Sequence, residues 1–193
     1  MKIKQIRFIT SATSPRHYPD YSCPEFAFMG RSNVGKSSLI NMLTGRKDLV
    51  KVGGKPGVTT TINFFLLNET ISLVDLPGFG YARLPKETRK TFLPMIKEYV
   101  GGRMTLKTVF LLIDIRRTPD DFERELIEVI TGRSVPVAIV ATKGDKISRN
   151  LRKRALNDIS KALGLDPEYI FISSAKTGEG KREILSLVRE FSA

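Results

Sequence analysis

The chain has 193 residues, of which 32 are lysine or arginine and 20 are aspartate or glutamate, so its formal net charge is +12 at pH 7. We expect one α/β domain with a substantial core, because the chain is too short for such a domain plus an appended module. No apolar run approaches membrane-spanning length, and the single cysteine excludes an internal disulfide, so we expect a cytoplasmic protein.

Residues 5–10 alternate between polar and apolar types, which predicts a strand within an N-terminal extension of about residues 1–23. The apolar run at residues 25–29 predicts a buried strand, and residues 36–44 predict a helix. Between these elements, eight residues fit the pattern G-x-x-x-x-G-K-S: Gly30, Arg31, Ser32, Asn33, Val34, Gly35, Lys36 and Ser37.

This pattern is typical of a phosphate-binding loop, or P-loop. Gly30 and Gly35 let the backbone turn tightly, so that its amides point at a β-phosphate, and the following helix N-terminus attracts anions. Lys36 would reach the β- and γ-phosphates, and the Ser37 hydroxyl would ligand Mg²⁺. The alternative is an ordinary glycine-rich turn.

The next two predicted strands, residues 61–67 and 70–75, are joined by a short hairpin connection. We therefore expect one antiparallel strand. The second strand ends in D-x-x-G, formed by Asp75, Leu76, Pro77 and Gly78. Asp75 would hold Mg²⁺ through a water, and the Gly78 amide would approach a γ-phosphate.

Two segments rich in glycine and proline flank these γ-phosphate contacts, Lys47–Thr60 and Gly78–Lys86. Both are poor candidates for fixed structure. We interpret them as switch regions that a γ-phosphate orders and hydrolysis releases. The alternative is surface loops without a regulatory role.

The chain continues with a predicted helix at 88–101, a strand at 107–114, a helix at 120–132 and a strand at 136–142. The last strand ends in T-K-x-D, formed by Thr142, Lys143, Gly144 and Asp145. The Asp145 carboxylate can accept two hydrogen bonds from guanine, whose donors adenine lacks, while the Lys143 stem covers the ring. The alternative is a strand-to-helix turn that the aspartate caps.

A helix at 148–162, a strand at 169–173 and a helix at 179–192 complete the predicted elements. Backbone amides of the small residues Ser173, Ser174 and Ala175 would donate to guanine O6. The alternation of strands and helices predicts a mostly parallel sheet that helices cover on both faces, with the phosphate-binding loops at the carboxyl ends of the strands.

In this order the motifs resemble those of the translation-factor class of P-loop GTPases. Residues 30–41, 56–65 and 75–82 look like the EngB family of bacterial GTPases, which act in large ribosomal subunit assembly and are linked to cell division. The resemblance implies a three-layer Ras-like fold and a single GTPase domain over residues 1–193. It also implies Mg²⁺ and GTP or GDP as ligands, and the large ribosomal subunit, or its precursor, as partner of a monomer.

The resemblance further implies that Thr59 ligands Mg²⁺ when GTP is bound. Three consecutive threonines leave the choice open, and the expected nucleotide-binding segment here comprises Gly57, Val58, Thr59, Thr60 and Thr61. Val58 stands where the family usually has arginine, so an arginine-based role at this position is not expected.

The candidate catalytic residues are Lys36, Thr59, Gly78 and Asn33. Phe79 stands where Ras-like enzymes carry a glutamine that orients the attacking water, so we expect slow intrinsic hydrolysis. Asn33 stands where potassium-activated GTPases carry an asparagine that ligands K⁺, and K⁺ would supply positive charge at the phosphates. The alternative is that Asn33 bonds only within its loop and the ribosome supplies the missing group.

The charge favours a polyanionic partner such as RNA. Basic residues are spread along the chain in clusters, one of which comprises Arg149, Arg152, Lys153 and Arg154. No aromatic base-stacking motif accompanies them, which favours contact with the phosphate backbone; the alternative for any one cluster is a solvated helix face. Competing functions are a small-molecule P-loop kinase, for which T-K-x-D would have no purpose, and an RNA-binding module without GTPase activity.

Overall fold

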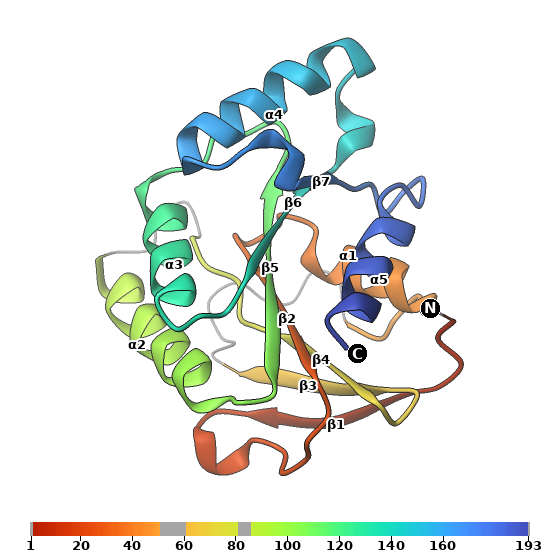
Figure 1. The fold of residues 1–193 in the computed structure, drawn as a ribbon, viewed down its shortest axis with the longest axis vertical. Helices are drawn as coiled ribbons and strands as arrows, with labels where there is room; N and C mark the ends of the chain where they lie inside the picture. Colours follow the sequence, from red (N-terminus) through yellow and green to blue (C-terminus); the bar gives the residue numbers. More distant parts are fainter. Residues whose placement is uncertain (1, 51–60, 81–85, 193) are drawn as a thin grey trace.

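The computed structural model describes residues 2–50, 61–80 and 86–192, and in them one twisted sheet lies between two layers of helices (Figure 1). The strands are β1 (Ile6–Ala12), β2 (Glu25–Gly30), β3 (Ile62–Leu67), β4 (Ile71–Asp75), β5 (Leu106–Asp114), β6 (Val137–Thr142) and β7 (Ile170–Ile172). The α-helices are α1 (Lys36–Thr44), α2 (Lys86–Gly102), α3 (Asp121–Thr131), α4 (Arg149–Leu163) and α5 (Lys181–Glu190). Short 3₁₀ turns, η1 (Pro15–His17), η2 (Gly144–Lys146) and η3 (Pro167–Tyr169), were not predicted.

The strand order is β1-β3-β4-β2-β5-β6-β7. Strand β3 is antiparallel to both of its neighbours, β1 and β4, whereas the pairs from β4 to β7 are all parallel. The expected α/β class, a mostly parallel sheet with one antiparallel strand and helices on both faces, is therefore confirmed. The N-terminal extension contributes the edge strand β1.

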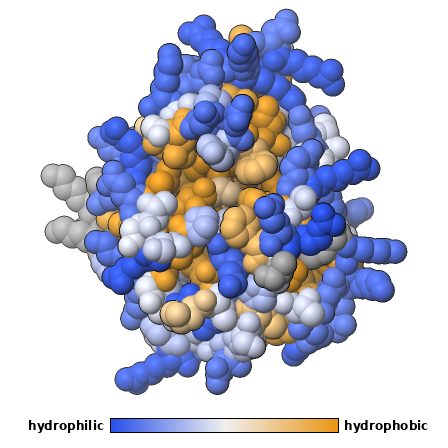
Figure 2. Space-filling view, viewed as in Figure 1, coloured by the Kyte–Doolittle hydropathy of each residue, from blue (hydrophilic) through white to orange (hydrophobic). Residues whose placement is uncertain are grey.

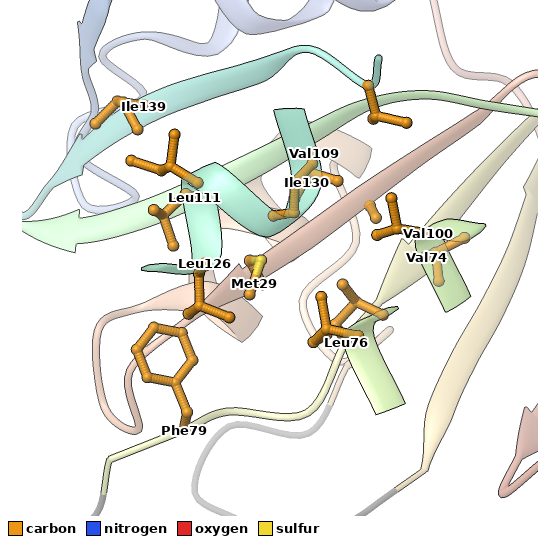
Figure 3. Packing of buried hydrophobic residues seen from close by; sticks show 14 of the residues in the cluster. Met29, Val74, Leu76, Phe79, Val100, Val109, Leu111, Leu126, Ile130 and Ile139 are labelled. Atoms are coloured by element: carbon orange, nitrogen blue, oxygen red, sulfur yellow. The ribbon is translucent and has the colours of Figure 1, made fainter. Parts of the chain in front are cut away.

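Each face of the sheet carries its own apolar core. On one face, β2 and β5 side chains such as Met29 and Leu111 pack against Leu126 of α3, beneath α2, α3 and α4 (Figure 3). On the other face, the stacked rings of Phe28 and Phe110, with centroids 4.7 Å apart, lie against α1 and α5. Two covered faces explain why β2 and β5 are continuous apolar runs rather than alternating ones.

A buried ion pair ties the N-terminal extension to the amino end of the sheet. The Glu25 carboxylate, fully buried, accepts hydrogen bonds from the Tyr99 hydroxyl at 3.0 Å and from the Arg103 guanidinium. Arg103 also donates to the Pro19 carbonyl at 3.2 Å. Burial, reinforced by the Glu25 charge, raises the pKa of Tyr99 well above its ordinary value, so this hydroxyl stays a donor.

The adjacent strands β4, β2, β5 and β6 end at the same edge of the sheet, because all four run parallel. The P-loop follows β2, D-x-x-G begins at the end of β4, and T-K-x-D begins at the end of β6. The topology thus brings together three motifs that are far apart in the sequence. Of the described helices, none is long and apolar enough to cross a membrane.

Candidate functional site

The P-loop is hydrogen-bonded to the segment that follows β4. The Ser32 amide donates to the Phe79 carbonyl at 2.7 Å, and the Phe79 amide donates to the Gly30 carbonyl at 3.2 Å. A β-carbon on Gly30 would lie 2.8 Å from the Leu112 carbonyl oxygen, so only glycine allows this approach to β5. Gly35 has φ +103°, a left-handed conformation that turns the chain into α1.

Lys36 and Asp75 meet at the centre of this edge. Their side chains form an ion pair and are only 13% and 6% exposed. Asn63 of β3 donates to the second Asp75 oxygen at 3.3 Å, which fixes the carboxylate. Ser37 lies in the first turn of α1. A serine hydroxyl and a carboxylate are oxygen ligands of the kind that suit Mg²⁺, which prefers few protein oxygens together with phosphates and water.

The predicted guanine-reading residues are also brought together. Asp145 lies in η2, and the Ser174 hydroxyl donates to its Oδ1 at 2.7 Å. This hydrogen bond lowers the pKa of Asp145, so the carboxylate stays an acceptor at neutral pH. Arg152 of α4 donates to the Gly144 carbonyl at 2.9 Å and forms an ion pair with Glu179. It thereby connects the T-K-x-D loop to the loop that follows β7. The sequence did not indicate this role of Arg152.

Two side chains connect the guanine loop directly to the P-loop. The Thr142 hydroxyl donates to the Val34 carbonyl at 2.7 Å, and the Lys143 ammonium donates to the Asn33 carbonyl at 2.7 Å. The Asn33 carbonyl is presented by a left-handed residue, with φ 63°. The Lys143 ammonium is thus bound to the backbone of the P-loop.

Asp114, at the end of β5, is a site residue that sequence reasoning missed. Its carboxylate pairs with Lys143 at 2.9 Å and accepts two hydrogen bonds from the Arg116 side chain. Burial disfavours its charge, but the hydrogen bonds from Arg116 and Lys143 outweigh burial and hold the pKa of Asp114 well below its ordinary value. An available signal was its position: like Asp75, it is an acid at the end of an apolar strand.

Phe79 is 1% exposed and packs on Phe92 and Phe122, with ring centroids 5.3 Å away in both cases. It is therefore a core side chain and does not face a phosphate. Beside the P-loop lies a cleft of about 120 Å³, whose lining includes Arg31, Asn33 and Arg117. Arg31 spans the cleft region toward α3, where it pairs with Asp120 at 2.9 Å.

Part of the predicted site lies outside the described residues. Gly57, Val58, Thr59 and Thr60 belong to this part, so the assignment of the switch I threonine stays a prediction; Thr61 is described and immediately precedes β3. The start of the first switch segment differs from expectation. Asn41 donates to the Lys47 and Val50 carbonyls at 2.9 Å, and its own side-chain oxygen accepts the Val50 amide, so residues 47–50 are anchored to α1.

Comparison with known proteins gives concordant results. The model of the 50S ribosome-binding GTPase family matches residues 25–143. The probable GTP-binding protein EngB of Geobacter sulfurreducens is 44% identical over 193 residues, which cover 100% of this chain and 94% of that protein. The corresponding protein of Desulforapulum autotrophicum is 49% identical, covering 94% and 93%. A crystal structure of a probable GTP-binding protein EngB superposes with a TM-score of 0.71 at 26% identity, covering 86% of this chain and 97% of that one.

Proposed function

The chain belongs to the EngB family of GTP-binding proteins, and we propose that it is a GTP-hydrolysing switch that acts in assembly of the large ribosomal subunit. The observation that best supports nucleotide binding is that the T-K-x-D loop is hydrogen-bonded directly to the P-loop. Thr142 and Lys143 of the guanine motif hold P-loop carbonyls, so one ligand would span both loops. A small-molecule kinase has no use for a base-reading carboxylate in this place.

We assign the nucleotide contacts as follows. P-loop amides and Lys36 bind the β- and γ-phosphates, and Asp145 accepts from the guanine N1–H and 2-amino group. Ser37, Asp75 and the predicted Thr59 would hold Mg²⁺, which would supply positive charge to the phosphate oxygens. Because Lys36 forms an ion pair with Asp75 in this structure, nucleotide binding would exchange that pair for phosphate contacts.

Asp145→Asn tests the base assignment. The amide presents a donor to a guanine donor, so we expect at least tenfold weaker GDP binding and improved binding of xanthosine diphosphate, whose 2-oxo group accepts. Asp158→Asn, an exposed change on α4, is the matched control. Titrations of GDP, xanthosine diphosphate and ADP would decide the matter. Unchanged GDP affinity in Asp145→Asn would exclude the assignment, and ADP binding as tight as GDP binding would favour the kinase.

Hydrolysis should be slow in the isolated protein, since buried Phe79 cannot orient a water. Two alternatives could complete the catalytic site. Either Asn33 holds a K⁺ that supplies positive charge at the phosphates, or the ribosome supplies the missing group. The test compares GTP hydrolysis in K⁺ and in Na⁺ at equal ionic strength, for wild type and Asn33→Ala. A K⁺ stimulation that the variant loses supports the first source; equal rates in all four conditions leave activation to the ribosome.

Ribosomal action is supported by the +12 charge and by the 50S ribosome-binding description of the matching family. We propose that a cytoplasmic monomer binds the large subunit, or its precursor, in the GTP state and leaves after hydrolysis. A role in cell division follows from family resemblance alone. Co-sedimentation of the protein with large and small subunits, in GDP and in a non-hydrolysable GTP analogue, tests this proposal. Equal binding in both nucleotide states would refute the switch.

A further inference from the structure

The exposed face of α4 is strongly basic. The helix contains five basic residues and one acidic residue, Asp158. Four exposed residues at intervals of four form what we call the α4 stripe: Arg149, Lys153, Asn157 and Lys161. Hydrophilic side chains project over this helix at the top of the space-filling view (Figure 2). At a rise of 1.5 Å per residue, the stripe runs for about 18 Å along the surface.

This arrangement opposes the stability of the helix. No acidic residue lies in its first turn, and its N-cap residue, Ser148, makes no side-chain capping hydrogen bond. Arg149 instead places a positive charge at the positive end of the helix dipole, and Lys153 lies four residues further along the same side. Charges that oppose local stability are expected where they serve binding.

Ion pairs do not neutralise the stripe. Within the part of the chain that the structure describes, no acidic side chain pairs with Arg149, Lys153 or Lys161. The neighbouring Arg154 is 83% exposed and only approaches Asp158, at 4.0 Å. Arg152 differs, because its guanidinium is engaged with Glu179. With respect to residues 2–50, 61–80 and 86–192, the stripe therefore presents three unpaired cations to solvent.

The helix that carries the stripe is firmly placed beside the guanine loop. Ile159 and Leu163 are buried in the core, and Arg152 bonds the Gly144 carbonyl of η2. Only Ile147 and Ser148 separate η2 from α4. A ligand on the stripe would thus be held at a fixed position next to the bound nucleotide.

We propose that the α4 stripe is a docking surface for the phosphate backbone of ribosomal RNA; this rests on the proposed ribosomal function. Protein interfaces have apolar cores that are depleted in lysine, whereas the four stripe positions carry no apolar or aromatic residue; Leu151, 54% exposed on the same helix, lies outside the stripe. Three cations, Arg149, Lys153 and Lys161, with no stacking ring among the stripe positions, suit a polyanion read through its backbone. Because α4 adjoins the guanine loop, docking would occur near the nucleotide without contacting it.

The test uses full-length Arg149→Ala/Lys153→Ala, bound to the GTP analogue. The control, Arg182→Ala/Arg189→Ala, removes the same charge from exposed positions on α5. We expect the α4 variant to bind large subunits about tenfold more weakly, and the slope of log K against log[salt] to become shallower by about 2. GDP affinity and thermal stability should not fall, because the substitutions relieve repulsion at a helix N-terminus and remove no nucleotide contact.

Binding should also weaken on large-subunit ribosomal RNA that has been freed of protein. If that RNA bound wild type and α4 variant equally while intact subunits did not, the partner would be a ribosomal protein and the inference would be wrong. If the α5 control lost as much affinity for large subunits as the α4 variant, net charge alone would explain the effect, and the inference would again be wrong. If wild type itself failed to bind large subunits, the proposed function would fall first, so the two failures are distinguishable.

Discussion

Helices α3 and α4 cover the same face of the sheet, yet their solvent sides have opposite chemistry (Figure 1). Both bury apolar residues in one core, among them Leu126 and Ile130 from α3 and Ile159 from α4. Among residues that are at least partly exposed, α3 has three acidic residues and one basic residue, whereas α4 has one acidic residue and five basic ones. The inward faces obey the same packing requirement, so the difference must come from what the outward faces do.

The N-termini sharpen this contrast. Asp120 and Glu123 form a complete capping box at the start of α3, and acidic residues occupy its first turn. The start of α4 has neither feature. Local sequence and fold agree in α3, which favours its stability. Their disagreement in α4 is what we expect if, as proposed, its exposed residues bind RNA.

The largest effect is expected from breaking the start of α3. Glu123 is fully buried, accepts the Asp120 amide at 3.0 Å and forms an ion pair with Arg117. Glu123→Ala should lower the free energy of unfolding by about 2–3 kcal/mol, since it removes half of the capping box and leaves Arg117 with only the more distant carboxylate of Asp120, at 3.9 Å. Urea unfolding measures this loss. Glu128→Ala, exposed on the same helix, should change stability by less than about 0.5 kcal/mol, and equal effects of the two variants would contradict the comparison.

Asp114 allows a second test, because its carboxylate forms ion pairs in the segments that precede both helices. Arg116 lies in the segment before α3, and Lys143 lies in the segment before α4. We expect Asp114→Asn to lower the free energy of unfolding by about 1–2 kcal/mol at pH 7. Since folding depresses the pKa of Asp114, its contribution is present above the unfolded pKa of about 3.9 and is lost as pH falls toward the folded value. The stability gap between wild type and variant, measured by urea unfolding, should therefore begin to narrow as pH falls below about 4 and should keep narrowing below pH 3. A constant gap would show that the charge of Asp114 is not responsible.

The sequence predicted the elements well where the signal is local. Helix α3 begins at Asp121, just after the predicted start at residue 120, and β2 was predicted from a continuous apolar run. The motifs were also recognisable because each is a short pattern at a strand end. Parallel topology then brings Lys36 to Asp75, and Ser174 to Asp145, so motifs that are far apart in the sequence share one edge of the sheet.

What the sequence could not indicate depends on partners far apart in the chain. Glu25 pairs with Arg103 across 78 residues, and Arg152 with Glu179 across 27. Before the fold was known, Arg152 belonged with Arg149 and Lys153 in one basic cluster. The structure separates them: Arg152 is half-buried and holds the guanine loops, whereas the other two face solvent. Composition reveals excess charge but not which cations are already paired.

The smallest effect on stability is expected when the charges in the first turns of α3 and α4 are reversed. Arg149→Glu puts an acid at the positive end of α4 and creates a favourable i,i+4 pair with Lys153, so we expect a gain of about 0.5–1 kcal/mol in the free energy of unfolding. Asp121→Lys makes the opposite change in α3, removes an exposed pair with Arg124, and should cost a similar amount. Urea unfolding at low ionic strength measures both, and 1 M salt should shrink both effects. Only Arg149→Glu should also weaken binding to large ribosomal subunits, so it would stabilise the fold and impair docking at once. If it destabilised the protein instead, Arg149 would be a structural residue, and the contrast between α3 and α4 would not reflect binding.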